Sequence, residues 1–387
     1  MKKLRVLQLA SYQGNIGDNA NLTGTRRALM KNLDFKLEFH DLEIREFFWK
    51  ERFYDVSFAD TVNEYDLFIF GGGNFFELWV DHSSNNTSVD IDISILKKIK
   101  TPTVFYSLGM DPGMGVSEKG VSKFKKWLDY VISQERFVLS LRNDGSRNVA
   151  KKYLGNSYAK HFHFCPDGGL FTEVPSATHP EIEEGMINVG MNLAGDMMDV
   201  RFPMDTTESI DSNTFLTELG QMFNNLFNKH DDLRLVLYPH IYKDLEIISR
   251  FTYKMNDKQV RKKVSCAPYL TGFEGQDYIF DSYLNCQLIM GNRFHTNICA
   301  MGLNIPSIGF INYRQIHDFY EEIDMLDRSV EVNMKGFSKD LELMIEDTLT
   351  NGKEVKKAYS EITNGLKDEL NSFHFYLNNW LKQIIGH

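Results

Sequence analysis

The chain has 387 residues, of which 42% are hydrophobic and 25% are charged, and its formal net charge is −10. Such a composition is typical of a folded protein with room for two domains. The negative charge argues against a protein that binds nucleic acid, because a phosphate backbone needs a broad basic face. A small anionic substrate would need a local basic pocket instead.

Four cysteines lie far apart in the sequence and match no spacing typical of a zinc site or a disulfide framework. They are Cys165, Cys266, Cys286 and Cys299. We therefore expect no bound metal, and a reducing cytoplasm suits these thiols. No stretch approaches the ~20 apolar residues of a transmembrane helix, so any contact with a membrane would be peripheral.

The first predicted strand, residues 4–9, runs into the sequence GNIGD at 14–18, and a helix is predicted from Leu22 to Leu33. A strand, a glycine-containing turn and a helix in this order are typical of an anion or sugar site at the edge of a parallel sheet. The glycine spacing is not GxGxxG, so no dinucleotide fold is predicted. A tight turn with Asp18 as the helix N-cap is the alternative.

Residues 45–54, REFFWKERFY, mix aromatic and charged side chains. Such a segment can lie on lipid head groups, with its rings at the interface and its cations over anionic lipid. Because Glu46 and Glu51 dilute the positive charge, a helix packed against the sheet is the favoured interpretation.

Three more apolar runs in the first half end in glycine or polar residues. Residues 65–70 lead into Gly71 to Gly73 and Asn74, residues 103–108 lead into Gly109, Met110 and Asp111, and residues 137–141 lead into Arg142. Glycines at strand ends indicate that the backbone closely approaches a ligand or another domain. We expect these corners and Gly14 to face the same cleft as Arg293. The polar stretch 175–184 is the predicted linker.

The second half begins a new series of strands and helices, and its most informative segment is residues 286–310. The apolar run 288–290 predicts a buried strand that breaks at Gly291-Asn292, directly before Arg293 and His295. An arginine offers a fork that fits a carboxylate or a phosphate, and a histidine can exchange a proton near neutral pH. The plain alternative is a histidine of the core beside an arginine in a salt bridge.

Other elements of this half include a strand at 187–193, helices at 213–229, 243–251 and 274–285, and a strand at 233–238 that ends in Pro239-His240. His240 either holds a donor phosphate or caps a helix. The tail from Lys353 to Ile385 has the apolar spacing of an amphipathic helix. The pattern of alternating strands and helices predicts an α/β class.

The motifs GNIGDNA, FGGGNFF, LGMDPG, SLRND, CPDGG, GNRFH and IPSIGF-INY occur in this order. With them the sequence resembles the polysaccharide pyruvyl transferase family over roughly residues 5 to 320. The resemblance implies a GT-B-like fold, with two Rossmann-like domains facing across a cleft. We expect the N-terminal, acceptor-side domain at 1–178, the C-terminal, donor-side domain at 179–345, and final helices at 346–387 that return to the first domain.

The resemblance also implies a reaction. Phosphoenolpyruvate would donate its pyruvyl group to a saccharide, free or lipid-linked, to form a pyruvate ketal in cell-surface polysaccharide biosynthesis, without a metal or further cofactor. Catalysis is expected from His295, Arg293 and Asp18; donor binding from Arg142, Arg293, His295, His240 and Asn292; and acceptor binding from Gly14, Asn15, Asp18, Gly72, Gly73, Asn74 and Asp111. His295 is the expected general acid, and Asp18 and Asp111 are the candidate bases.

The sequence departs from the family pattern at three positions. Asn292 and Phe294 stand where the family has apolar Met or Ile and Leu, and Arg314 lies close to where a lysine is common. Two other functions stay open at this point: a nucleotide-sugar glycosyltransferase on the same scaffold, and a non-catalytic carbohydrate-binding protein. The enzyme would act in the cytoplasm, with possible peripheral contact at the inner face of the membrane.

Overall fold

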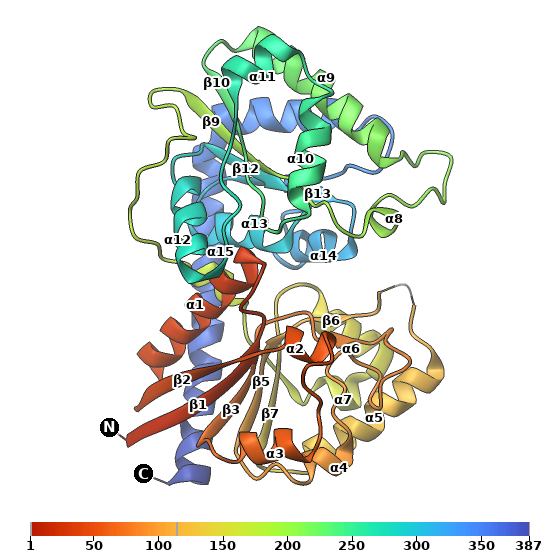
Figure 1. Cartoon of the computed structure of the whole chain (residues 1–387), viewed down its shortest axis with the longest axis vertical. Coiled ribbons are helices and arrows are strands. Elements are labelled where there is room, and N and C mark those ends of the chain that lie inside the picture. Colours follow the sequence, from red (N-terminus) through yellow and green to blue (C-terminus); the bar gives the residue numbers. More distant parts are fainter. Residues whose placement is uncertain (1, 114, 387) are drawn as a thin grey trace. The chain divides into compact units, whose positions relative to one another are not determined.

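The computed structural model describes residues 2–113 and 115–386, and the chain divides into two compact units (Figure 1). Unit 1 contains the residues up to Gln13, Asn21–Gly168, and the residues from Gly365 onward. Unit 2 contains Gly14–Ala20 and Gly169–Asn364. The chain therefore changes units at 13/14, 20/21, 168/169 and 364/365. The sequence suggested domain boundaries at 178/179 and 345/346.

Unit 1 is built on a parallel sheet with the strand order β2-β1-β3-β5-β7-β8. Strands β2 and β3 pair on opposite sides of β1, so the strand order reverses at β1. The carboxyl ends of β1 and β3 therefore form the switch point of this sheet. The strands are β1 (Lys2–Ala10), β2 (Phe35–Glu43), β3 (Leu67–Gly71), β5 (Thr103–Leu108), β7 (Phe137–Leu141) and β8 (Phe162–Phe164), and β4 (Phe76–Glu77) pairs with β6 (Met110–Asp111) in a small second sheet. The helices are α1 (Ile16–Asn32), α2 (Arg45–Phe48), α3 (Val56–Val62), α4 (Ile93–Leu96), α5 (Glu118–Ile132), α6 (Ser146–Leu154) and α7 (Asn156–Ala159).

An aromatic core fills one face of this sheet. Phe70 and Phe105 stack with ring centroids 4.7 Å apart. The amphipathic helix α5 buries Phe124 and Trp127 against them, and Ser117 caps its N-terminus by accepting the N–H of Gly120. Large rings dominate this core because each buries a wide apolar surface.

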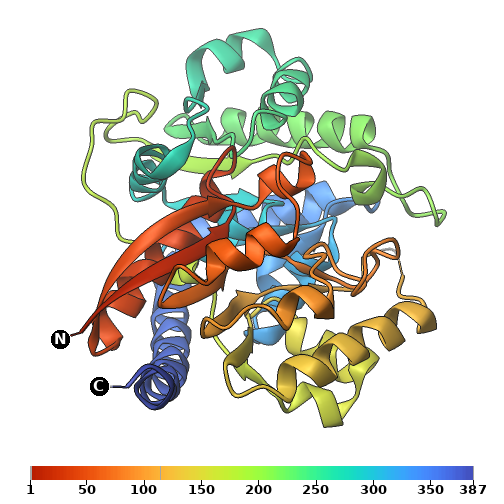
Figure 2. The same cartoon turned by 60° about the horizontal axis from the view of Figure 1, so that its bottom comes forward.

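The last part of helix α15 (Phe337–Ile385), from Gly365 onward, packs on the other face of the same sheet beside α1 (Figures 1 and 2). Tyr106 Oη lies 2.7 Å from His374 Nε2, and Asn32 Nδ2 donates to Asn371 Oδ1 at 3.0 Å. The end of the chain is therefore part of unit 1.

Unit 2 contains a parallel sheet with the order β11-β10-β9-β12-β13-β14. This is the order 3-2-1-4-5-6 of Rossmann folds, which reverses between the first and fourth strands, here β9 and β12. The strands are β9 (Ile187–Asn192), β10 (Leu233–Leu237), β11 (Val264–Cys266), β12 (Leu288–Gly291), β13 (Ser307–Ile311) and β14 (Ser329–Glu331). The helices are α8 (Met198–Arg201), α9 (Ser212–Lys229), α10 (Asp244–Thr252), α11 (Asp257–Lys263), α12 (Gly272–Tyr283), α13 (Phe294–Gly302) and α14 (Arg314–Glu322), with short 3₁₀ turns at Gly168–Phe171 and Leu326–Arg328.

The core of unit 2 lies between the sheet and helices α9, α10 and the first part of α15. Asp211 caps α9 by accepting the N–H of Thr214 at 2.7 Å, and Phe215, Leu219 and Phe223 then follow at helical spacing and are fully buried. The predicted α/β class and the two Rossmann-like sheets are confirmed.

Two predicted helix starts differ from the structure. Helix α1 begins at Ile16 rather than Leu22, because Asn15 Oδ1 accepts the N–H of Gly17 and caps the helix. Asp18 is therefore inside the first turn, and the prediction of Asp18 as the N-cap is wrong. The terminal helix extends much further toward the N-terminus than Lys353, since it begins at Phe337.

The segment 45–54 is only partly helical. Helix α2 ends at Phe48, and Lys50 then adopts a left-handed conformation with φ 61°. Phe47 stacks on Tyr54 at 4.1 Å, as the packed interpretation expects, whereas Phe48 and Trp49 are each 53% exposed. Across residues 2–113 and 115–386, no helix has the length and apolar character needed to cross a bilayer.

Candidate functional site

Arg293 occupies the corner between β12 and α13, at the switch point of unit 2. It has an extended backbone conformation (φ −91°, ψ 138°) at the N-cap position of α13. Its Nε donates to Asp244 Oδ2 at 2.8 Å, its Nη2 donates to Asp196 Oδ1 at 2.9 Å, and Nη2 also contacts Asp244 Oδ1. The guanidinium is thus held rigidly by two carboxylates.

The two carboxylates that hold Arg293 differ in exposure. The Asp244 side chain is fully buried, whereas that of Asp196 is 25% exposed. Burial by itself would raise the pKa of Asp244. The positive charge of Arg293, its hydrogen bonds to Asp244 and the hydrogen bonds from backbone N–H groups outweigh burial, so the pKa of Asp244 is lowered. Asp244 is therefore a permanent counter-ion, and Asp196 is the carboxylate that an incoming anion could displace.

His295 lies in the first turn of α13, and the GNIGD corner packs against it. Its Nδ1 is 3.8 Å from Asp18 Oδ1, an ion-pair distance when the imidazole is protonated. A Cβ atom on Gly17 would lie 2.5 Å from His295 Cβ, so only glycine allows this approach. Gly14, Asn15 and Asp18, expected on the acceptor side, thus belong to the same unit as His295.

His240 is completely buried beside this corner. Its Nε2 lies 2.8 Å from Tyr283 Oη, and its backbone N–H donates to Asp244. Burial lowers the pKa of His240 to about 3, and neighbouring positive charges add to that shift against the opposing charge of Asp244. The ring is therefore neutral, so a contact with a donor phosphate would be a hydrogen bond and not an ion pair.

Asn292 holds two strand ends of unit 2 together. It is buried, and its Oδ1 accepts the N–H of Ala194 at 2.8 Å, which ties the loop after β9 to the end of β12. This bond gives Asn292 a structural task, and its predicted contact with the donor stays a prediction.

Arg201 is a residue of this edge that the sequence analysis missed. Its Nη1 donates to Asn312 Oδ1 at 3.1 Å, and its Nη2 lies 3.7 Å from Asp196 Oδ1. Burial and the charge of Arg293 lower the pKa of Arg201 to about 10, although Asp196 opposes the shift. Two guanidiniums therefore share Asp196. In the sequence, the feature that could have revealed Arg201 is a cationic residue soon after the predicted strand 187–193.

A second polar cluster lies in unit 1 around Arg142, directly after β7. The Arg142 side chain is buried; its Nε donates to Asp144 Oδ2 at 2.7 Å and its Nη1 to Asp167 Oδ2 at 3.2 Å. Asp167 also accepts the side-chain N–H of Asn21 at 2.6 Å. A Cβ on Gly109 would lie 3.0 Å from Arg142 Nη2, so this glycine makes room for the guanidinium.

Asn74 lies near Arg142, since a Cβ on Gly109 would lie 2.6 Å from Asn74 Oδ1 and 3.0 Å from Arg142 Nη2. Gly72 and Gly73 follow β3, and Asn74 Nδ2 donates to Asp111 Oδ2 at 3.1 Å. The predicted acceptor residues are thus divided: Gly72, Gly73, Asn74 and Asp111 belong to unit 1, and Gly14, Asn15 and Asp18 belong to unit 2. A cleft shared by the two sets stays a prediction.

Glu77 is a further carboxyl group that the sequence analysis did not single out. It pairs with Asp111 in the small sheet of β4 and β6. Burial raises the pKa of Glu77 to about 7, a hydrogen bond from Ser88 opposes the shift, and Asp111 adds to it. In the sequence, the feature that could have revealed Glu77 is a carboxyl group three positions after Asn74.

The two Rossmann-like units, each with charged side chains at the carboxyl ends of its strands, define a protein of the GT-B fold class. Similar solved structures include a protein from Listeria monocytogenes assigned as a UDP-N-acetylglucosamine 2-epimerase (TM-score 0.56, 10% identity, 94% of this chain and 91% of that chain). They also include a glycosyltransferase from Rickettsia africae (TM-score 0.54, 11% identity, 100% of this chain and 99% of that chain). A third is a UDP-GlcNAc 2-epimerase from Neisseria meningitidis bound to UDP-GlcNAc (TM-score 0.52, 8% identity, 98% of this chain and 98% of that chain). At these identities the similarity concerns the fold alone.

The chain belongs to the polysaccharide pyruvyl transferase family, whose model matches residues 15–314. This match covers most of the sequence, including both polar clusters, and confirms the resemblance drawn from the motifs. A comparison with curated proteins finds no matching sequence.

Proposed function

We propose that the protein transfers the pyruvyl group of phosphoenolpyruvate to a saccharide and forms a pyruvate ketal. The observation that carries this proposal is the corner of unit 2, where His295 lies beside Asp18 and two residues after Arg293. One titratable group and one fixed cation at a switch point suit a small anionic substrate that must receive a proton. Family membership supports the same reaction class.

The donor is expected to bind at the start of α13. Phosphoenolpyruvate carries a carboxylate and a phosphate, and Arg293 and Arg201 can each offer N–H groups to one of them. The first N–H groups of the nine-residue helix α13 add partial positive charge. We infer that the donor carboxylate takes the place of Asp196 on Arg293. Arg142 keeps its predicted role in donor binding.

The transfer requires balanced proton movements. His295 gives a proton to the methylene carbon, while a sugar hydroxyl forms a bond to the adjacent carbon. A second hydroxyl forms the other ketal bond as the carbon–oxygen bond to phosphate breaks. Of the two hydroxyl protons, one replaces the proton lost by His295 and one leaves with phosphate. Asp18 orients the imidazole, and Asp18 or Asp111 accepts the hydroxyl proton first.

For the acceptor, we propose a sugar bound near Asn74 and Asp111, whose amide and carboxylate suit sugar hydroxyls. A lipid-linked acceptor would place the reaction at the cytoplasmic face of a membrane. The exposed rings of Phe48, Trp49 and Phe53 (53%, 53% and 61% exposed) support peripheral contact there. Binding to lipid vesicles, compared between the wild type and a variant with all three rings replaced by serine, tests this part.

The decisive experiment incubates the purified protein with phosphoenolpyruvate and extracted lipid-linked oligosaccharides. Release of phosphate that depends on the acceptor, together with the mass gain of one pyruvate ketal, is the expected result. We expect the same rate with a chelator present, because the proposed chemistry requires no metal. Release of a nucleotide from a sugar nucleotide instead would favour the glycosyltransferase alternative, which the shared fold keeps open.

A further inference from the structure

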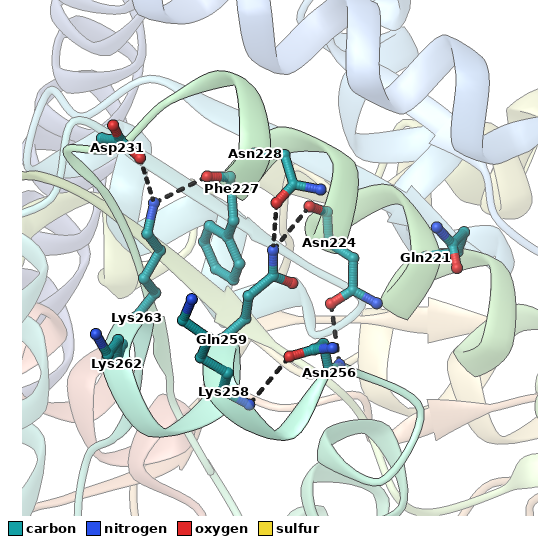
Figure 3. A pocket seen from close by; sticks show the side chains of 10 residues that line it. All are labelled: Gln221, Asn224, Phe227, Asn228, Asp231, Asn256, Lys258, Gln259, Lys262 and Lys263. Carbon is teal, nitrogen blue, oxygen red and sulfur yellow. Dashed lines mark hydrogen bonds and ion pairs between the residues drawn. The ribbon is translucent and has the colours of Figure 1, made fainter.

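A hollow of about 790 Å³ in unit 2 is lined mainly by residues of α9 and α11, whose side chains Figure 3 shows. Asp231 lies two residues before β10 and Lys263 lies directly before β11, so the hollow is at the amino ends of these parallel strands. Arg293 follows the carboxyl end of β12. The hollow is therefore separate from the proposed donor site.

Carboxamide side chains form much of its wall. Gln221, Asn224 and Asn228 lie along one stripe of α9, at spacings of three and four residues. Gln259 of α11 faces this stripe, and its Nε2 donates to Asn224 O at 3.1 Å and Asn228 Oδ1 at 2.9 Å. Asn256 adds a fifth amide, and its backbone N–H donates to Asn224 Oδ1. The wall is thus preorganised by its own hydrogen bonds.

The Gln259 amide leaves one acceptor unused. Its Oε1 is buried and has no hydrogen-bond partner among the residues that the structure describes. Two acceptors on its Nε2 fix the orientation of the amide, so the oxygen cannot simply exchange places with the nitrogen. A buried unpaired oxygen costs free energy unless something donates to it.

Three lysines give the hollow a positive charge. Lys263 Nζ is held at 2.9 Å by each of two carbonyl oxygens, of Phe227 and His230, and lies 3.8 Å from Asp231. Lys258 and Lys262 are exposed, and neither has an ion-pair partner in the described part of the chain. With three lysines against Asp231, the lining carries a net charge of +2 on a chain whose net charge is −10.

The lining favours one class of ligand. Amides pair well with sugar hydroxyls because each offers a donor and an acceptor, and the lysines suit carboxylate or phosphate groups. The ring of Phe227 is only 2% exposed and offers no free face on which a nucleobase could stack. We propose that this hollow binds an anionic oligosaccharide, at a site distinct from the donor edge.

Equilibrium binding of a hexamer of galacturonic acid, measured by calorimetry without phosphoenolpyruvate, tests the inference. The wild type should bind this probe, bind neutral maltohexaose much more weakly, and lose affinity in high salt. The variant Lys258→Gln/Lys262→Gln should bind the acidic hexamer roughly tenfold more weakly. Both lysines are exposed, so the variant should fold normally. The matched control Lys98→Gln/Lys100→Gln changes two exposed lysines of unit 1 and should bind like the wild type.

Equal affinity of the wild type and the Lys258→Gln/Lys262→Gln variant would overturn the inference. So would an equal loss in the Lys98→Gln/Lys100→Gln control, or competition by inorganic phosphate as strong as that of the hexamer, which would indicate a simple anion site. Because no donor is present, these results do not depend on whether the protein transfers pyruvyl groups.

Discussion

His295 Nδ1 and Asp18 Oδ1 lie 3.8 Å apart, although one residue is near the start of the chain and the other is in its last third. The contact exists because α1 begins at Ile16 and Gly17 has no side chain, so the first turns of α1 and α13 can meet. In our proposal this pair supplies and orients the transferred proton.

Replacement of His295 by glutamine tests its role as the acid. The glutamine side chain would keep hydrogen bonding but could not give a proton, so turnover should fall about 10²–10⁴-fold while donor affinity changes little. Single-turnover rates and donor affinities of both proteins provide the measurement, with His317→Gln, whose side chain is 40% exposed on α14, as a control. Equal losses of turnover and donor affinity would remove His295 from the acid role.

Gly17→Ala should lower activity because the new methyl group displaces the imidazole. Its Cβ would lie 2.5 Å from His295 Cβ, and a shift of about 1 Å in a catalytic group can cost about 10²-fold in rate. Gly365→Ala, also in a helix but with nothing within 4 Å of the new Cβ, is the matched control and should keep full activity. Steady-state kinetics of Gly17→Ala and Gly365→Ala test this expectation. Equal rates in the two variants would show that His295 need not occupy this position.

Arg293 should contribute to stability as well as to donor binding. In Arg293→Ala the fully buried Asp244 would lose its counter-ion, at a cost of about 3–5 kcal/mol in the free energy of unfolding. Arg293→Lys should lose less stability but bind the donor more weakly, since an ammonium cannot reproduce the fork. Urea unfolding and donor titration measure the two effects. The double variant Arg293→Ala/Asp244→Asn should recover stability without recovering donor binding; its failure to do so would contradict the assignment.

Asp196→Asn should strengthen donor binding. If the donor carboxylate displaces Asp196 from Arg293, removing this competing charge should tighten binding by roughly fivefold at low salt. Asp199→Asn, an exposed change in the adjacent helix α8, should leave the affinity unchanged. Titration with phosphoenolpyruvate distinguishes them, and weaker binding in Asp196→Asn would show that Asp196 helps to hold the donor.

Glu77 should make stability depend on pH. Its pKa is raised from 4.5 to about 7, so the folded protein holds this proton more tightly than the unfolded chain. The resulting stability is complete below about pH 4.5 and is lost as the pH rises through 7. The difference in unfolding free energy between Glu77→Gln and the wild type should therefore grow by up to about 3 kcal/mol between pH 4.5 and 8. Urea unfolding of both proteins is measured at each pH, so that the contributions of the other titrating groups cancel in the difference. A difference in unfolding free energy that does not change with pH would contradict the buried environment of Glu77.

Most of the fold was predictable from the sequence because its elements have strong local signals. The buried strands are short apolar runs that end at glycine or polar residues, as at Gly71 and Gly291, and helix α9 (Ser212–Lys229) starts one residue before the predicted helix 213–229 and ends with it. The start of α1 was misplaced because Gly17 and Asn19 are weak helix formers. Their helical conformation depends on the cap from Asn15 and on contacts made by the folded unit.

The sequence by itself determined the fold class, the order of the motifs and the residue types that the chemistry needs, including Arg142, Arg293 and His295. Only the tertiary structure decided their partners: Asp18 at His295, Asp244 and Asp196 around Arg293, Arg201 beside them, and a neutral His240. The physical reason is that strand and helix signals act over neighbouring residues, whereas charge pairing and burial depend on which distant segments meet. Local patterns in a sequence therefore specify elements, and the packing of those elements specifies the electrostatics of a site.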